Sequence, residues 1–315
     1  MMRGGPTWDK PPGIRSKVNI MAGPKIWLDY DQQELDDQYN QRTLVPDAND
    51  YMARHLELSK AVRTEHPCRL DLAYGPSEDE ILDIFPAQNS PNGAAPCVVY
   101  YHGGAWTRWH KDYNSYQAPA FTGAGVTFIS VNFALVPDVD LDELIRQCRA
   151  VVQWVHANAA EIGIDPARLF VAGHSSGGHI AGLMAVTDWA NDWGLPRDAV
   201  KGAICASGMY ELEPARLSSR NEYMKLDDGA VARNSTIRQI PEHMPPMVIA
   251  FGGGELQEFR RQSQDFAAEL KARGHDCTEL DLPAMNHFQV AEQFADPAGA
   301  LMRAAFQMME TLKVG

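Results

Sequence analysis

Cysteine is scarce in this chain of 315 residues, and no two cysteines form a CxxC pair. The five that occur are scattered: Cys68, Cys97, Cys148, Cys205 and Cys277. Because three of them stand in apolar runs, we expect buried apolar side chains rather than metal ligands or disulfide bridges. An odd, dispersed set of cysteines is typical of a reducing compartment.

Long hydrophobic runs and an excess of positive charge are also lacking. No apolar run approaches the length of a membrane span, and the N-terminal residues contain no apolar core of a secretory signal. Lysine and arginine number 28 against 41 aspartates and glutamates, for a net charge of −13. This balance argues against nucleic acid and anionic membranes as partners. We therefore expect a soluble cytoplasmic protein.

The remaining composition is that of a globular protein, with 45% hydrophobic and 22% charged residues. Apolar strand-like runs alternate with helix-like spacing along most of the chain, which predicts an α/β fold with a mainly parallel sheet and helices on both faces. The first two strands alternate polar and apolar residues and predict an antiparallel edge. The expected strands are Arg69–Tyr74, Ile81–Phe85, Ala95–Tyr101, Val126–Phe133, Leu169–Ala172, Val200–Ala206, Met247–Phe251 and Cys277–Leu282.

Helical spacing is expected over residues 32–64 and over Leu141–Ala160, Phe259–Arg273 and Ala291–Leu312. Residues 1–24 are rich in glycine, proline and charge and predict an extended arm. We expect the remainder, 25–315, to form a single domain. Within it, residues 209–245 interrupt the strand–helix rhythm directly after a core strand, and we expect them to form a small cap over the active site.

The most informative stretch is LFVAGHSSGGHIAG at residues 169–182. An apolar run enters the pattern Gly-x-Ser-x-Gly centred on Ser175, and a helix of small residues follows. This is the sequence form of a nucleophile elbow, in which glycines flank a serine on a very sharp turn. The pattern alone is shared by many unrelated turns, but its position between a strand and a helix nominates Ser175 as a nucleophile.

The sequence HGGAW at residues 102–106 follows the expected strand Ala95–Tyr101. Backbone N–H groups at Gly103 and Gly104 lack side-chain shielding, so they are candidates for an oxyanion hole. The third candidate donor is the N–H of Ser176, which follows the nucleophile. His102 is expected to brace this loop rather than to act as a base.

Among ten histidines, His287 is the candidate general base, because it lies in a short loop after the last strand. His174 and His179 flank the elbow and are expected to pack or hydrogen-bond; their spacing does not favour a metal site. The candidate acid is Glu255, directly after the strand Met247–Phe251. Glu258 is an alternative that more naturally begins the next helix, and Asp281 lies inside a strand.

These motifs together resemble the kynurenine formamidase (arylformamidase) branch of the α/β-hydrolases, near the hormone-sensitive-lipase-like esterases. The resemblance covers about residues 27–312 and includes SGMYELEP at 207–214, EFRRQS at 258–263 and NHFQVAE at 286–292. It implies a triad of Ser175, Glu255 and His287. One departure is that the family usually carries aspartate where this chain has Glu255.

We therefore expect a serine hydrolase of a small aryl amide or ester, in first place an arylformamidase that converts N-formylkynurenine to kynurenine and formate. The alternatives are a carboxylesterase for small aromatic or xenobiotic esters and a non-catalytic ligand receptor. No cofactor and no metal are expected, and the resemblance makes a homodimer the starting assumption. Candidate pocket-wall residues are Trp106, Tyr113, Met209 and Tyr210.

Overall fold

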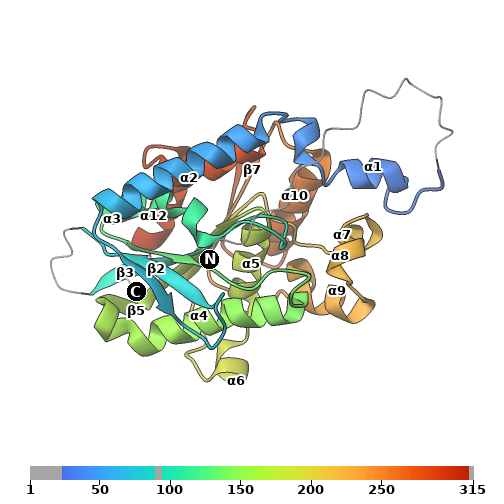
Figure 1. Ribbon diagram of the computed structural model, residues 1–315. Coiled ribbons are helices and arrows are strands. Elements are labelled where there is room, and N and C mark those ends of the chain that lie inside the picture. The colour runs from blue at the N-terminus through green and yellow to red at the C-terminus, as the bar shows by residue number, and fades with distance from the viewer. Residues whose placement is uncertain (1–22, 89–93, 312–315) are drawn as a thin grey trace.

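The computed structural model describes residues 23–88 and 94–311 and contains one eight-stranded sheet in the order β1-β2-β4-β3-β5-β6-β7-β8 (Figure 1). The edge strand β1 pairs antiparallel with β2, β2 pairs antiparallel with β4, and every other pair in the sheet is parallel. The strands are β1 (Arg69–Ala73), β2 (Ile81–Phe85), β3 (Ala95–Tyr101), β4 (Thr127–Val131), β5 (Ile164–His174), β6 (Gly202–Ala206), β7 (Met247–Gly252) and β8 (Cys277–Leu282). The predicted α/β-hydrolase sheet with its antiparallel edge is confirmed.

Helices cover both faces of this sheet (Figure 1). The α-helices are α1 (Gln32–Asp37), α2 (Ala48–Glu65), α3 (Ala118–Gly123), α4 (Leu141–Ile162), α5 (Ser176–Val186), α6 (Trp189–Trp193), α7 (Glu213–Leu217), α8 (Asn221–Met224), α9 (Asp228–Asn234), α10 (Gln257–Ala272), α11 (His287–Glu292) and α12 (Ala300–Thr311). Short 3₁₀ helices are η1 (Gln41–Thr43), η2 (Lys111–Tyr113), η3 (Ser115–Gln117), η4 (Thr236–Arg238) and η5 (Gln293–Ala295).

The inner strands β3, β4, β6 and β7 are buried on both faces, so a hydrophobic cluster forms on each side of the sheet. Neighbouring residues of β3 illustrate the alternation: Val99 belongs to the cluster under α4 and α5, and Val98 to the cluster under α3 and α12. The longest described helix, α4, is capped at its N-terminus by Asp140, whose side chain accepts the Glu143 N–H, and at its C-terminus by Gly163 in the left-handed region. Its apolar residues recur at helical spacing and pack on the sheet.

Two predicted helical segments are divided in the structure. Residues 32–64 form α1, η1 and α2, and the interruption precedes α2 at Pro46, which lacks an N–H donor. The prediction of one continuous helix over Ala291–Leu312 was wrong, because a turn separates α11 and η5 from α12. Pro297 and Gly299 lie in that turn, where their backbone preferences disfavour a continuous helix.

Residues 209–245, where we expected a cap, contain α7, α8, α9 and η4 and connect β6 to β7. Short helices in this region lie beside α1, and the Ser219 N–H donates to Asp36. The predicted N-terminal arm falls almost entirely on residues 1–22, outside the described residues. None of the helices in the described part of the chain has the length and apolarity needed to cross a bilayer.

Candidate active site

Ser175 lies on the sharp turn between β5 and α5. Its φ of 59° and ψ of −126° are strained for a residue with a side chain. The turn closes because the flanking glycines allow close backbone approach: a Cβ at Gly173 would lie 2.1 Å from the Gly177 carbonyl oxygen, and one at Gly177 would lie 2.0 Å from the Tyr101 oxygen. The Gly-x-Ser-x-Gly pattern therefore has a steric cause in this backbone.

The structure brings Ser175, His287 and Glu255 together in one buried chain of hydrogen bonds. The Nε2 atom of His287 lies 3.0 Å from Ser175 Oγ, and its Nδ1 contacts Glu255 Oε1. His287 begins α11, where Asn286 caps the helix and forms a reciprocal capping box with Gln289. This cap fixes the backbone that carries the imidazole.

Glu255 is held on both carboxylate oxygens. Its Oε2 accepts hydrogen bonds from Ser207 Oγ at 2.8 Å and from the Gly252 N–H at 2.7 Å. The alternative carboxylates lie elsewhere: Glu258 is buried against Arg261 and Gln262, and Asp281 is an exposed residue of β8. Sequence reasoning did not identify Ser207, because nothing local in the sequence indicates a contact across 48 residues.

Two candidate oxyanion donors, Gly103 and Gly104, line the same cavity as Ser175, and the third, Ser176, directly follows it in the chain. A Cβ on Gly103 would approach Ser175 Cβ to 3.2 Å, so its bare backbone faces the serine. Gly104 has a φ of 120°, and a Cβ there would lie 2.0 Å from the Arg108 carbonyl oxygen. Ser176 is the first residue of α5, so its N–H has no partner within the helix. The Trp106 N–H donates to Ser176 Oγ and joins the two loops.

A cavity of about 300 Å³ opens over this group. Ser175, His287, Gly103 and Gly104 are part of its wall. The wall also includes polar, charged and aromatic residues from several elements: Tyr39, Gln41, Arg42, His55, Tyr100, Arg108, Trp109, Tyr113, Tyr116, Arg220, Phe259 and Phe288. Much of the wall therefore comes from residues 39–55, which precede the sheet and which the sequence did not nominate.

Of the four residues expected to line the pocket, the structure places only Tyr113 in its wall. Trp106 is buried behind the loop because its indole N–H donates to His179 Nδ1 at 3.2 Å. Tyr210 stacks on Phe266 and is fully buried, and Met209 is buried beside it in the core. The pocket assignment of Trp106, Met209 and Tyr210 was wrong, because all three point into the protein interior.

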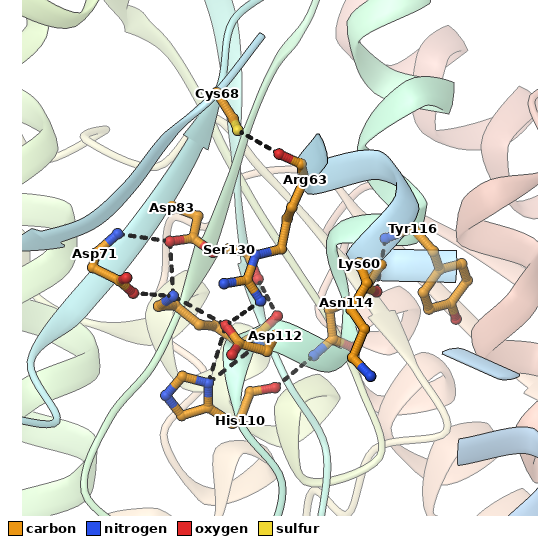
Figure 2. Close-up of polar contacts among 12 residues, drawn as sticks. Lys60, Arg63, Cys68, Asp71, Asp83, His110, Asp112, Asn114, Tyr116 and Ser130 are labelled. Atoms are coloured by element: carbon orange, nitrogen blue, oxygen red, sulfur yellow. Dashed lines mark hydrogen bonds and ion pairs between the residues drawn. The ribbon is translucent and has the colours of Figure 1, made fainter. Parts of the chain in front are cut away.

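A buried ion cluster anchors the loop that carries the pocket residues of η2 and η3 (Figure 2). Lys111 Nζ contacts Asp83 at 2.7 Å and Asp71 at 2.6 Å, and both Lys111 and Asp83 side chains are fully buried. Burial works to lower the pKa of Lys111, but the carboxylates of Asp83 and Asp71 raise it overall. Asp112 adds a contact to Lys111 and pairs with Arg63 of α2. The pocket wall is thus tied to β2 and to α2.

Three histidines near the elbow are buried, and desolvation is the first cause of their lowered pKa values. The pKa is lowered to about 4 for both His102 and His179. The pKa of His174 is lowered further, and the adjacent His287 contributes. His179 accepts from Trp106 and contacts the Asn234 carbonyl oxygen with its other nitrogen, which suits a neutral imidazole. These histidines brace the site in uncharged form.

Comparisons with known proteins agree with this geometry. The family model BD-FAE matches residues 82–204. Carboxylesterase NlhH of Mycobacterium tuberculosis is 42% identical over 224 residues, which cover 65% of this chain and 70% of that protein. Kynurenine formamidase of Danio rerio is 28% identical over 295 residues, or 90% of this chain and 98% of that protein.

A solved structure of a protein from a Silicibacter species, provisionally called a thioesterase, superimposes with a TM-score of 0.74 at 25% identity. It covers 86% of this chain and 98% of its own. The fold and the relatives define a serine hydrolase. The chain belongs to the hormone-sensitive-lipase-like family of α/β-hydrolases and is similar to both its carboxylesterases and the kynurenine formamidases.

Proposed function

We propose that this protein is an arylformamidase that hydrolyses N-formylkynurenine to kynurenine and formate, with Ser175 as nucleophile, His287 as base and Glu255 as the orienting acid. The observation that carries the proposal is the hydrogen-bonded chain of these three side chains in the wall of an aromatic cavity. Similarity to kynurenine formamidase along 90% of the chain supports the choice of substrate.

In the first half of the reaction, His287 Nε2 takes the Ser175 hydroxyl proton as Oγ attacks the formyl carbon. The carbonyl oxygen gains negative charge, which the N–H groups of Gly103, Gly104 and Ser176 stabilise. Glu255 holds the Nδ1 proton and balances the positive imidazolium. The C–N bond then breaks, and His287 returns the proton to the leaving aryl amine.

In the second half, water replaces the amine beside the formyl-serine. His287 removes a proton from the water, and the hydroxide oxygen attacks the ester carbon. The same N–H groups stabilise the second oxyanion. When the C–Oγ bond breaks, the proton on His287 returns to Ser175, and formic acid departs and loses its remaining proton to water as formate. No group outside the chain and water is required for this balance.

The cavity wall favours an aromatic leaving group. The aromatic residues Trp109, Tyr113, Tyr116, Phe259 and Phe288 all belong to its lining. Flat aromatic substrates gain from stacking and edge contacts with such rings. A formyl group is the smallest acyl group and needs little space beside Ser175, so most of the roughly 300 Å³ remains for the aryl part.

The second candidate function is a carboxylesterase of small aromatic esters, which the 42% identity to carboxylesterase NlhH favours. Steady-state hydrolysis of N-formyl-L-kynurenine and of p-nitrophenyl acetate separates the two. We expect a higher kcat/KM for the formamide, and loss of both activities in Ser175→Ala. Ester turnover without formamide turnover would refute the arylformamidase and leave the esterase. Failure of a fluorophosphonate probe to label the wild type would refute Ser175 as nucleophile.

We also propose a cytoplasmic location, which is supported by the five cysteines, none of them in a disulfide. Fractionation of the native cells with a compartment marker tests it, and recovery outside the cytoplasmic fraction would contradict it. The homodimer stays a prediction that light scattering of the pure protein can decide.

A further inference from the structure

The charge of the cavity wall is opposite to that of the whole chain. The chain carries 41 acidic residues against 28 basic ones, yet the lining contains three arginines and neither aspartate nor glutamate among the described residues. The arginines are Arg42, Arg108 and Arg220. Anions are attracted to a concave surface of this kind, because low-dielectric walls focus its field.

Arg108 lines the cavity without a hydrogen-bond or ion-pair partner among the described residues, whereas Arg42 donates to Asn49 Oδ1 at 2.8 Å. Partial burial of its guanidinium, followed by the like charges of Arg220 and Arg42, lowers the pKa of Arg108. A bound anion would relieve this repulsion.

Arg220 is fixed in place but retains a free donor. Its Nη2 donates to the Tyr39 carbonyl oxygen at 2.7 Å, and its guanidinium lies over the Tyr39 ring at 5.0 Å. Its Nη1 donates to the Tyr223 hydroxyl, while the buried Nε has no partner in the described structure. The planar group is therefore oriented before any ligand arrives.

Gln41 supplies an independent sign of a missing ligand. Its side chain is 9% exposed and lines the cavity, yet neither its Oε1 nor its Nε2 has a hydrogen-bond partner in the described residues. A buried amide without partners costs about 1–3 kcal/mol. An arriving group with both an acceptor and a donor would satisfy it.

This part of the wall adjoins the catalytic histidine through aromatic rings. Tyr39 contacts Phe259 edge to face at 6.2 Å between ring centroids, and Phe259 contacts His287 in the same manner at 5.0 Å. An aryl group beside Phe259 would therefore have the reacting bond on one side and the arginines on the other.

We propose that Gln41, Arg108 and Arg220 form a subsite for a carboxylate carried by the leaving group of the substrate. The inference rests on the proposed function in taking an aryl amine as leaving group, and it adds which residues bind the carboxylate of that amine and select for it. Arginine binds a carboxylate through paired N–H groups, and the Gln41 amide can complete the contacts. Binding of the carboxylate then favours a charged substrate over neutral aryl amides of similar size.

The test compares two formamides that differ only in the carboxylate: N-formylkynurenine and N-formylkynuramine, its decarboxylated analogue. The measured quantity is the ratio of their kcat/KM values. Arg108→Gln should lower this ratio about tenfold or more, as expected for the loss of one charge-assisted contact, and Arg108→Lys should restore part of it. Arg197→Gln, an exposed arginine outside the cavity, is the matched control and should leave the ratio unchanged.

Gln41→Leu provides a second variant of similar side-chain volume. It should reduce the same ratio through a higher KM with kcat retained, while its thermal midpoint is at least that of the wild type, because no hydrogen bond inside the protein is lost. An unchanged ratio in both Arg108→Gln and Gln41→Leu would overturn the subsite. An equal loss of kcat/KM for both formamides would overturn it as well, since that result would indicate general damage to the pocket.

A pair of esters separates this inference from the proposed function. 3-Acetoxybenzoate and phenyl acetate share the acetyl group and differ by a carboxylate on the leaving group. If the wild type hydrolyses neither formamide but prefers 3-acetoxybenzoate, and Arg108→Gln abolishes that preference, the subsite stands and the arylformamidase falls. If the formamides are hydrolysed with no preference for the carboxylated one, the arylformamidase stands and the subsite falls.

Discussion

Replacing Glu255 with glutamine exchanges one carboxylate oxygen for an NH₂ group of nearly the same size. In the wild type, Oε1 accepts from His287 and Oε2 accepts from Ser207 and from the Gly252 N–H. All three partners donate hydrogen bonds, and a glutamine has only one acceptor oxygen, so it can accept either from His287 or from Ser207 and Gly252 but not from both sides. Its orientation decides the tautomer of the histidine.

The Gly252 N–H belongs to the backbone and cannot rotate, whereas the Ser207 hydroxyl can. We therefore expect the glutamine oxygen to face Gly252 and its NH₂ to face His287 Nδ1. The imidazole must then accept at Nδ1 and carry its proton on Nε2, where it cannot take a proton from Ser175. The analogous change in serine proteases lowers kcat about 10⁴-fold by this mechanism, which corresponds to about 5.5 kcal/mol in the activation barrier.

The assay is kcat for p-nitrophenyl acetate and N-formyl-L-kynurenine, normalised to folded protein by circular dichroism. Glu258→Gln is the matched control, because Glu258 is buried against Arg261 and does not contact His287. We expect Glu255→Gln to lower kcat by about 10³–10⁴-fold. Glu258→Gln should instead lower the free energy of unfolding and have little effect on kcat. A loss below tenfold in Glu255→Gln, or a larger loss of kcat in the control, would refute Glu255 as the orienting acid.

Three further results are expected. Ser207→Ala leaves Glu255 Oε2 with the Gly252 N–H alone and should lower kcat by about tenfold with KM unchanged; full activity would remove Ser207 from the site. Lys111→Met removes the cationic partner of the buried Asp83 carboxylate, which keeps only the Asp71 N–H, and should cost about 3–5 kcal/mol in urea unfolding; a loss below about 1 kcal/mol would contradict the role of the ion cluster. Burial lowers the pKa of His179 to about 4 from 6.5, so the neutral ring stabilises the fold above pH 6.5 and that contribution disappears as the pH falls toward 4. The urea midpoint should fall over this pH interval, and it should fall less steeply with pH in His179→Gln. An identical pH dependence in the two proteins would show that His179 does not contribute to it.

The sequence predicted the bounds of some strands closely, whether apolar residues are continuous, as in β3, or mixed with polar ones, as in β8. The expected bounds Ala95–Tyr101 and Cys277–Leu282 are those of β3 and β8. The elbow at Ser175 was also predictable, because only glycines tolerate the backbone approach at the flanking positions. Chain order then located His287 and Glu255 at strand ends, and the structure brings both to the serine.

The pocket wall was not predictable in the same way. Residues 39–55 reach the cavity only through tertiary packing, and their many charged residues are what a solvent-exposed helix would also contain. Trp106 was misplaced for a related reason. A tryptophan beside an oxyanion loop can face either the substrate or the protein, and only the position of the His179 ring decides for the interior.

The proposed triad and much of the pocket wall come from different parts of the chain, and this separation affects how the substrate range of the enzyme can evolve. The proposed nucleophile, base and acid all come from residues 175–287, whereas much of the wall that would meet the rest of the substrate comes from residues 39–55. Selectivity and bond cleavage are therefore separately evolvable. A laboratory library confined to residues 39–52 should generate new substrate ranges while the reactive serine stays intact, so a single generic activity-based probe could count the functional clones in every round.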